Sequence, residues 1–163
     1  MPMLIRQTSI LAIGLALCGC TASYTARYRT SSVETLNQIE RNPARYTSEL
    51  YAFRGRVIRA AEERGKLVFQ MITYDDSTQF GGPSLIVVYP NTKIPVVKDH
   101  KVRVLGKIGP AVSGTNLFGG VVSSVTMNAI AVWDVTAGRV SWLSDYEDTY
   151  HEWASGALFK PSD

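Results

Sequence analysis

Cysteine and histidine are nearly absent from the chain, and their scarcity excludes several classes of protein. The two cysteines, Cys18 and Cys20, lie near the N-terminus, and no cysteine follows them. The rest of the chain therefore cannot hold a disulfide framework. The two histidines, His100 and His151, are far from the cysteines and from each other, which does not match the ligand spacing of a zinc site. We accordingly expect no metal site and no cofactor.

The chain also lacks a strong excess of charge of either sign. Its formal net charge is +3, and its lysines and arginines are scattered rather than gathered in a run that could bind nucleic acid. Hydrophobic residues make up 45% and charged residues 19% of the 163 residues, which is typical of an ordinary globular protein. We therefore expect one folded domain and no nucleic-acid partner.

No apolar run approaches the roughly 20 residues that a membrane-spanning helix needs. The apolar run at 10–17 is far shorter; a short segment carrying Arg6 precedes it, and small residues follow it. This layout is typical of an export signal. Residues 1–19 are therefore predicted to be a signal peptide that is removed from the mature protein.

At the end of this leader, the residues Leu17, Cys18, Gly19 and Cys20 resemble the lipobox of bacterial lipoproteins. The resemblance implies a diacylglyceryl group on Cys20 Sγ, cleavage before Cys20, and usually a further acyl chain, such as palmitate, on the new amino terminus. The chemistry needs cysteine because a thiolate is the strong nucleophile among side chains at neutral pH. The alternative is an ordinary secretory signal that is cleaved at a small residue such as Ala22.

The residue after Cys20 bears on the expected destination of the lipoprotein. It is Thr21 and not the aspartate that resembles an inner-membrane retention signal. The expected location is therefore the cell envelope, with the lipid in the outer membrane and the protein facing the periplasm.

Beyond the lipobox, the pattern of the sequence divides the chain into a tether and a body. Residues 20–32 have no apolar period and are expected to tether the body to the lipid. A short amphipathic helix is predicted over 33–41, because Ser32 is a good N-cap and Asn42-Pro43 ends the pattern. Strand patterns follow at 50–59, 66–74, 84–89, 101–109 and 127–133, with a turn at 62–65, a loop at 75–83, no helix over 91–100, and a mobile hairpin or lid over 109–124.

The five strand patterns resemble an OB-fold, the small Greek-key barrel. The resemblance rests on a helix that ends in Asn-Pro, on Phe53-x-Gly55-x-Val57 in the first strand, and on residues 100–108 as the fourth strand. Gly55 and Gly106 suit places where a barrel strand bends sharply. We predict a mainly β fold, a five-stranded Greek-key (OB-like) barrel preceded by one short helix, within a domain over 33–135. An open sandwich is the alternative, since the usual helix between the third and fourth strands is missing.

Among lipidated proteins of this kind, the chain is similar to the Slp family of outer-membrane lipoproteins. Residues 136–163 form a C-terminal tail in which Tyr146, Tyr150 and Trp153 recur at helical spacing between acidic residues, so a short helix is expected there. We interpret these aromatic residues as packing onto the barrel. The alternative is a docking face for another envelope protein.

Catalytic motifs with a specific spacing are absent from the sequence: it has no Gly-x-Ser-x-Gly, no His-Glu-x-x-His and no phosphate-binding glycine loop. We therefore predict that the protein is not an enzyme. The predicted function is a membrane-anchored binding or structural module whose partner is an envelope protein or a glycan. The alternative is a small envelope enzyme that uses His100 with the carboxylates of Asp75 and Asp76.

OB-folds often bind single-stranded nucleic acid through aromatic residues on their second and third strands. Phe69, Tyr74 and Tyr89 lie near such positions in this sequence. Their alternative role is packing in the core, and export to the envelope would keep nucleic acid out of reach.

Overall fold

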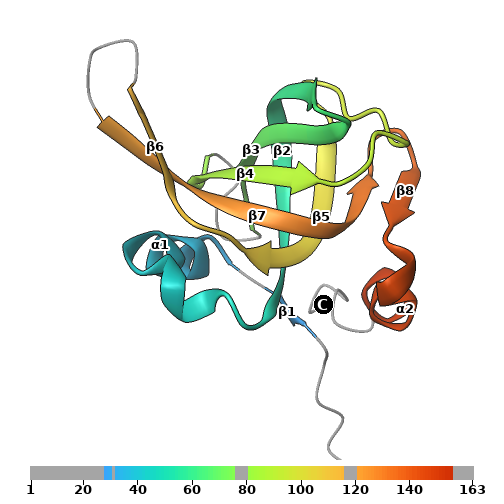
Figure 1. Ribbon diagram of the computed structural model, residues 1–163, viewed down its shortest axis with the longest axis horizontal. Coiled ribbons are helices and arrows are strands. Elements are labelled where there is room, and N and C mark those ends of the chain that lie inside the picture. The colour runs from blue at the N-terminus through green and yellow to red at the C-terminus, as the bar shows by residue number, and fades with distance from the viewer. Residues whose placement is uncertain (1–27, 31, 76–80, 116–120, 156–163) are drawn as a thin grey trace, which may run out of the picture.

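A computed structural model describes residues 28–30, 32–75, 81–115 and 121–155 of the chain. Its centre is a closed barrel of the strands β2 (Leu50–Glu63), β3 (Lys66–Thr73), β4 (Ser84–Tyr89), β5 (Lys101–Ile108) and β7 (Val121–Asp134). The strands neighbour one another in the order β2, β3, β4, β7, β5, and β5 pairs with β2 again to close the ring (Figure 1). Only the β4–β7 pair is parallel among these five strands.

This strand order is that of the OB-fold, so the predicted barrel is confirmed. The pairing of β2 with β5 closes the ring and excludes the open sandwich. β3 and β4 alternate between buried and more exposed residues, whereas the second half of β2 is exposed from Ile58 to Glu63. The inward side chains form one continuous core that includes Val57, Phe69, Met71, Leu85, Val87, Tyr89, Val102, Val104, Met127 and Val132.

Two glycines lie where neighbouring barrel strands leave no room for a side chain. A Cβ on Gly106 would meet the backbone oxygen of Asn128 and the Cα of Ala129, and the register of β5 against β7 shifts at this glycine. A Cβ on Gly55 would lie 2.8 Å from the backbone oxygen of Ile72. The register shift confirms the irregularity predicted at Gly106. At Gly55 the pairing with β5 continues without a shift, and the structure shows a close approach of strands that suits glycine.

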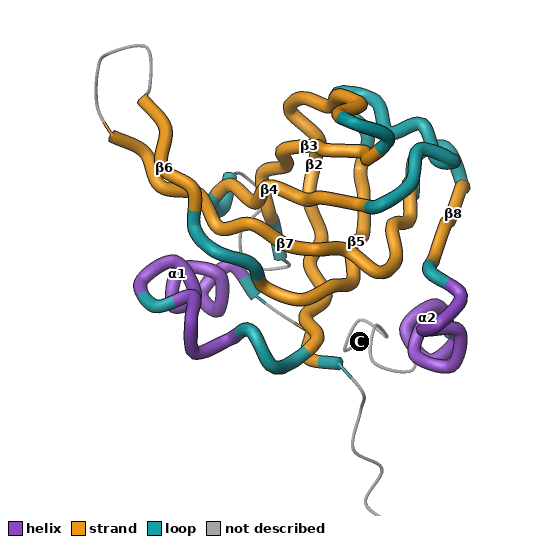
Figure 2. Tube along the Cα trace, viewed as in Figure 1, coloured by secondary structure: helices purple, strands orange, loops and turns teal. Residues whose placement is uncertain are grey.

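The predicted first helix is confirmed as α1 (Val33–Arg41), which lies against one end of the barrel (Figure 2). The amide of Thr35 donates to Oγ of Ser32 at 3.2 Å, as expected of an N-cap. Leu36 and Ile39 on its inner side are fully buried in the barrel core. A 3-10 turn, η1 (Pro43–Tyr46), then leads to β2.

Residues 90–100, between β4 and β5, form no helix, as the sequence predicts. They still contribute to the core through Ile94 and Val96, which are buried. A barrel end that a helix covers in many OB-folds is thus filled here by an irregular segment.

The folded body is larger than the predicted range of 33–135. The short strand β1 (Arg29–Thr30) pairs in parallel with Tyr51 and Ala52, inside the range of the predicted tether. At the other end, β8 (Arg139–Trp142) pairs with β7, and η2 (Ser144–Tyr146) and α2 (Glu147–Ala154) follow. The short helix predicted in the tail is confirmed as α2.

The last long strand also begins earlier than predicted, at residue 121 instead of 127. Its first half pairs with β6 (Val112–Thr115), and the two project from the barrel as a hairpin (Figure 1). The predicted leader over 1–19, Cys20, and part of the predicted loop over 75–83 lie outside the described residues.

Candidate functional site

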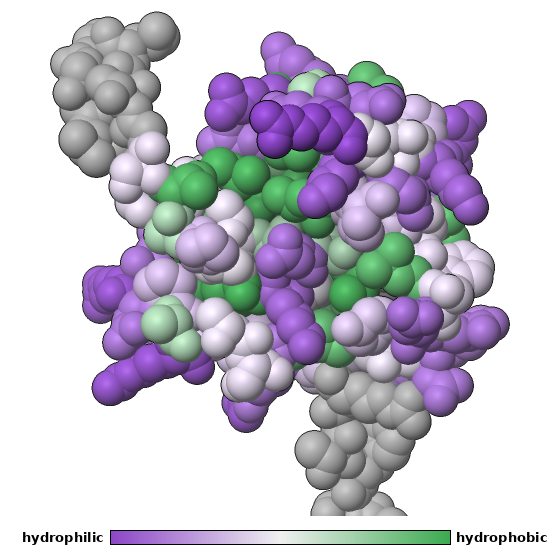
Figure 3. Space-filling view, viewed as in Figure 1, coloured by the Kyte–Doolittle hydropathy of each residue, from purple (hydrophilic) through white to green (hydrophobic). Residues whose placement is uncertain are grey.

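The outer surface of the barrel has two contrasting sides. On one side, no segment of the described ranges covers the outward residues of the second half of β2 and of β3 and β4, and we call this surface the open face. The strand register places its members in rows; they are Arg56, Arg59, Ala61, Glu63, Lys66, Val68, Gln70, Ile72, Ser84, Ile86 and Val88. Figure 3 shows hydrophobic surface gathered where β4 crosses the front of the barrel. Val68, Ile86 and Val88 are only half-buried there.

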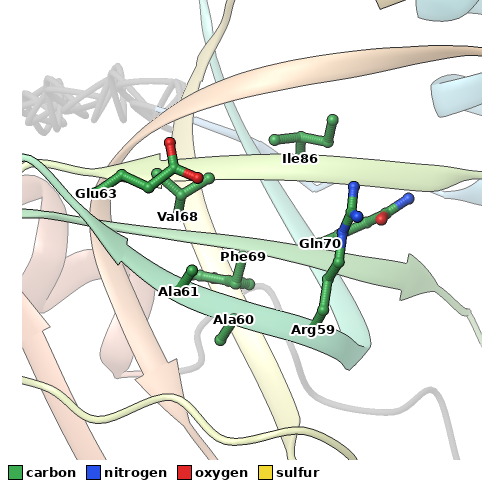
Figure 4. A pocket seen from close by; sticks show the side chains of 8 residues that line it. All are labelled: Arg59, Ala60, Ala61, Glu63, Val68, Phe69, Gln70 and Ile86. Carbon is green, nitrogen blue, oxygen red and sulfur yellow. The ribbon is translucent and has the colours of Figure 1, made fainter. Parts of the chain in front are cut away.

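A hollow of about 300 Å³ lies on the open face. It is lined by Arg59, Ala60, Ala61, Glu63, Val68, Phe69, Gln70 and Ile86. Figure 4 shows Arg59 and Gln70 extending to the same side at one end of the hollow, with Glu63 beside Val68 at the other. The small side chains of Ala60 and Ala61 leave the hollow open between them.

The hollow forms because β2 changes its register just before it. The pairing of β2 with β3 shifts between Val57 and Arg59, so that Arg59 lies opposite Gln70 and Ala61 lies opposite Val68. Such a bulge re-aims the residues that follow it. The Gln70 amide is held in place because its Nε2 donates to Oγ of Ser84 at 2.5 Å.

A second hollow, of about 250 Å³, is lined by residues of β3, β4, β5 and β7 and by Tyr146 of η2. Val88 lines it together with the exposed residues Lys66 and Lys107. Within the part of the chain that the structure describes, the exposed charges of both hollows, Arg59, Glu63, Lys66 and Lys107, form no ion pair. These charges are therefore free to meet a ligand.

The opposite side of the barrel, which we call the covered face, presents the outward residues Ala52, Arg54, Arg103, Leu105, Ala131 and Trp133. Trp153 of α2 packs on it and is fully buried, with its ring centre 6.2 Å from that of Trp133. Tyr28, at the start of the described body, is buried in the same cluster. The segments at both ends of the body thus close this face.

Arg103 lies within this covered face beside two indole rings. Its guanidinium carbon is 5.1 Å from the ring centre of Trp133 and 5.6 Å from that of Trp153. Burial lowers the pKa of Arg103 from its usual value, because loss of water disfavours the charged form. The cation–π contacts compensate for part of that loss.

The packing of the tail confirms the interpretation that its aromatic residues cover the barrel. Trp153 is buried, and Tyr146 and Tyr150 pack against the same cluster. Tyr150 also stacks on Trp142 with ring centres 4.0 Å apart. Trp153, the centre of the alternative docking stripe, is thus already engaged within the chain.

The structure gives His100 a partner that the sequence did not indicate. Its Nδ1 lies 2.7 Å from Oδ2 of Asp134, whose side chain is fully buried. The other oxygen, Asp134 Oδ1, accepts a hydrogen bond from the amide of Ala137 at 2.9 Å. The pair therefore braces the turn between β7 and β8, because it ties the start of β5 to that turn.

The carboxylate predicted to act with His100 lies in a different environment. Oδ2 of Asp75 accepts a hydrogen bond from the amide of Val33 at 2.8 Å, at the N-terminus of α1. A carboxylate is favourable at that end of a helix, which explains this aspartate structurally. Asp76 lies outside the described residues. No group of three metal-ligating side chains occurs within the described ranges.

Two of the three aromatic residues considered as a stacking platform are core residues. Phe69 and Tyr89 are 1% and 0% exposed, so the alternative of core packing is confirmed for both. Tyr74 is half-buried, and Arg54 lies 5.9 Å above its ring centre. The open face therefore presents aliphatic and polar side chains where many OB-folds present aromatic ones.

Comparisons with known proteins add little to this geometry. No family model matches the chain, and no curated protein matches it. Among solved structures, it is similar to a small single-stranded DNA-binding protein from Streptomyces coelicolor, with 14% sequence identity and a TM-score of 0.38. That likeness covers 54% of this chain and 94% of the other. Among the described residues, no helix has the length and hydropathy needed to cross a membrane.

Proposed function

We propose that this chain is a lipid-anchored protein of the cell envelope whose OB barrel is a non-enzymatic binding module. Acyl chains on Cys20 would hold it on the periplasmic side of the outer membrane. The observation that carries the binding role is the open face, where half-buried aliphatic side chains surround a hollow and no segment of the described body covers them. The anchor rests on the likeness of residues 17–20 to a lipobox.

The distance between the anchor and the body supports this arrangement. Tyr28, which is buried against the covered face, follows Cys20 by eight residues. A fully extended chain rises by at most about 3.6 Å per residue, so this segment spans no more than about 29 Å. The end of the barrel at β1 would then lie toward the membrane, and the open face over β3 and β4 would look sideways into the periplasm (Figure 1).

A protein partner suits the open face better than a glycan. Sugar rings and nucleic-acid bases are commonly bound on exposed aromatic faces, and the aromatic ring that lines the hollow, Phe69, is buried in the core. Aliphatic side chains around a small hollow are instead the usual complement of apolar side chains from another protein. The use of the second and third strands of the OB-fold for binding is a fold-level analogy.

Mass spectrometry of the protein purified from bacterial envelopes tests the anchor. The expected result is a chain that begins at Cys20 and carries a diacylglyceryl group. Cys20→Ser should abolish the lipid, whereas Cys18→Ser, two residues away, should retain it. An unmodified amino terminus at any other residue would refute the anchor.

A further inference from the structure

We infer that the open face recognises an extended segment of a partner protein in which acidic residues flank apolar ones. The inference rests on the proposed binding function and names the chemistry of the ligand. It is carried by the arrangement of charge around the two hollows.

Basic residues predominate along the rim of the open face. Arg56 lies opposite Ile72 and Arg59 lies opposite Gln70, so both arginines belong to the outward rows of β2. Lys66 and Lys107 line the second hollow from β3 and β5. All four side chains are exposed, and none of them forms an ion pair within the described ranges. An anionic ligand would therefore meet unpaired positive charge at both ends of the apolar surface.

Glu63 is the one acidic residue in the outward rows of the open face. It lies directly opposite Lys66 in the β2–β3 pairing, and the two form no ion pair there. The negative charge of Glu63 would repel an acidic ligand. Because Glu63 lies across from Lys66, it also weakens the positive potential around that lysine. Neutralising Arg59 and neutralising Glu63 should therefore change the affinity for an acidic ligand in opposite directions.

The shape of the face favours a peptide over a membrane. Val68, Ile86 and Val88 are half-buried and lie in or beside the hollows rather than on projecting loops. A flat lipid surface cannot reach the floor of a hollow, whereas single aliphatic side chains of an extended segment can. Such a segment rises by about 3.3 Å per residue, the same as the strands below it, so its side chains can follow the rows of the face.

The scarcity of aromatic side chains at the two hollows argues against single-stranded nucleic acid, because Phe69 is buried in the core and Tyr146, in the second hollow, is half-buried. Stacking on aromatic rings supplies much of the sequence-independent affinity of OB-folds for such ligands. The outward rows of the open face contain aliphatic, amide, hydroxyl and charged groups. A phosphate backbone would find the basic rim but only the half-buried ring of Tyr146 on which to stack its bases.

The test uses the full-length protein in detergent micelles and a fluorescent peptide, acetyl-Asp-Val-Ala-Val-Asp-amide, whose binding is followed by fluorescence anisotropy. Arg59→Gln is expected to weaken binding by about fivefold or more, and Glu63→Gln is expected to tighten it by a similar factor. Arg139→Gln removes an equal charge from β8, on the covered side, and should leave binding unchanged. The same peptide with asparagine in place of aspartate should bind at least about fivefold more weakly.

The inference is overturned if the peptide does not bind at millimolar concentration, or if Arg59→Gln and Arg139→Gln have equal effects. It is also overturned if Glu63→Gln weakens binding. Tighter, Arg59-dependent binding of an oligo-deoxythymidine, or of vesicles containing phosphatidylglycerol, would assign the face to nucleic acid or to lipid instead. A photo-crosslinking residue at position 86, used in envelopes, distinguishes failure of the acidic-segment inference from failure of the proposed binding function. A specific protein adduct without peptide binding would reject the acidic segment and leave the binding module standing.

Discussion

The covered face and the open face belong to one barrel, but segments from outside the barrel pack only on the covered face among the described residues. The outward residues of the covered face include the large rings of Trp133 and the half-buried Arg103, and α2, β8 and Tyr28 pack over them. The outward residues of the open face include Val68 and Ile86, which stay half-buried. Exposed aliphatic surface is unfavourable in water, and this contrast between the two faces is the reason for proposing that the open face meets a partner.

The largest effect that we expect concerns Trp153, the anchor of the covered face. Trp153→Ala should lower the free energy of unfolding by about 3–5 kcal/mol, because a fully buried indole and its contacts with Trp133 and Arg103 are lost. Urea unfolding followed by circular dichroism measures the change. A loss below about 1 kcal/mol would mean that α2 does not seal this face in solution.

A substitution of His100 tests the contact between His100 and Asp134, which holds the turn that leads from β7 to β8. His100→Ala should destabilise the protein by about 1–3 kcal/mol, because the buried carboxylate of Asp134 loses a hydrogen-bond partner. The other histidine provides the control, since His151 is exposed and lies 3.6 Å from Glu147 in a surface pair. His151→Ala should change the stability by less than about 0.5 kcal/mol in the same unfolding assay. Equal effects of the two substitutions would show that this contact is not formed.

Tyr51, on the strand that pairs with β1, gives a smaller and spectroscopic test. Burial, and then the hydrogen bond that its hydroxyl donates to Glu49 at 3.1 Å, raise the pKa of Tyr51 to about 12. A raised pKa means that the stabilisation from the neutral phenol is complete below the unfolded value near 10 and is lost as the pH rises through 12.

Absorbance at alkaline pH follows this ionisation. Glu49→Gln should bring the Tyr51 transition to lower pH, because it removes the negative charge next to the phenol. An unchanged transition would show that Glu49 does not contribute to the shift.

The smallest effect on stability should come from the open face itself. Ile86→Thr should cost less than about 1 kcal/mol, because the side chain is half-buried and points away from the core. The adjacent Val87 is fully buried, and Val87→Thr should cost about 1–3 kcal/mol because it places a hydroxyl in the core. Thermal unfolding of both variants checks the contrast. Similar losses of stability in the two variants would mean that the Ile86 side of β4 is as buried as the Val87 side.

Much of the barrel could be predicted from local patterns in the sequence. The N-cap at Ser32, the five barrel strands and the irregularity at Gly106 depend on short-range signals, and the structure contains all of them. The hairpin of β6 and the start of β7 agrees with the hairpin predicted over 109–124. The short strands β1 and β8 could not be predicted, because two to four residues show no period and their pairing depends on distant partners.

The candidate site was harder to predict than the barrel, for two physical reasons. Val68, Ile86 and Val88 are apolar although they point outward, so their strands resemble strands that are buried on both sides. The partner of His100 is 34 residues away, and no local motif connects His100 with Asp134. Only the closed barrel brings these residues together.

The central claim is that the open face, and not the covered face, meets a partner in the envelope. A photo-crosslinking amino acid placed at Ile86 tests it directly in living bacteria, with Arg139 on β8 as the matched exposed position. We predict a discrete protein adduct from position 86 that Arg59→Gln diminishes, and none from position 139. Adducts of equal yield from both positions, or an adduct from position 139 alone, would contradict the account.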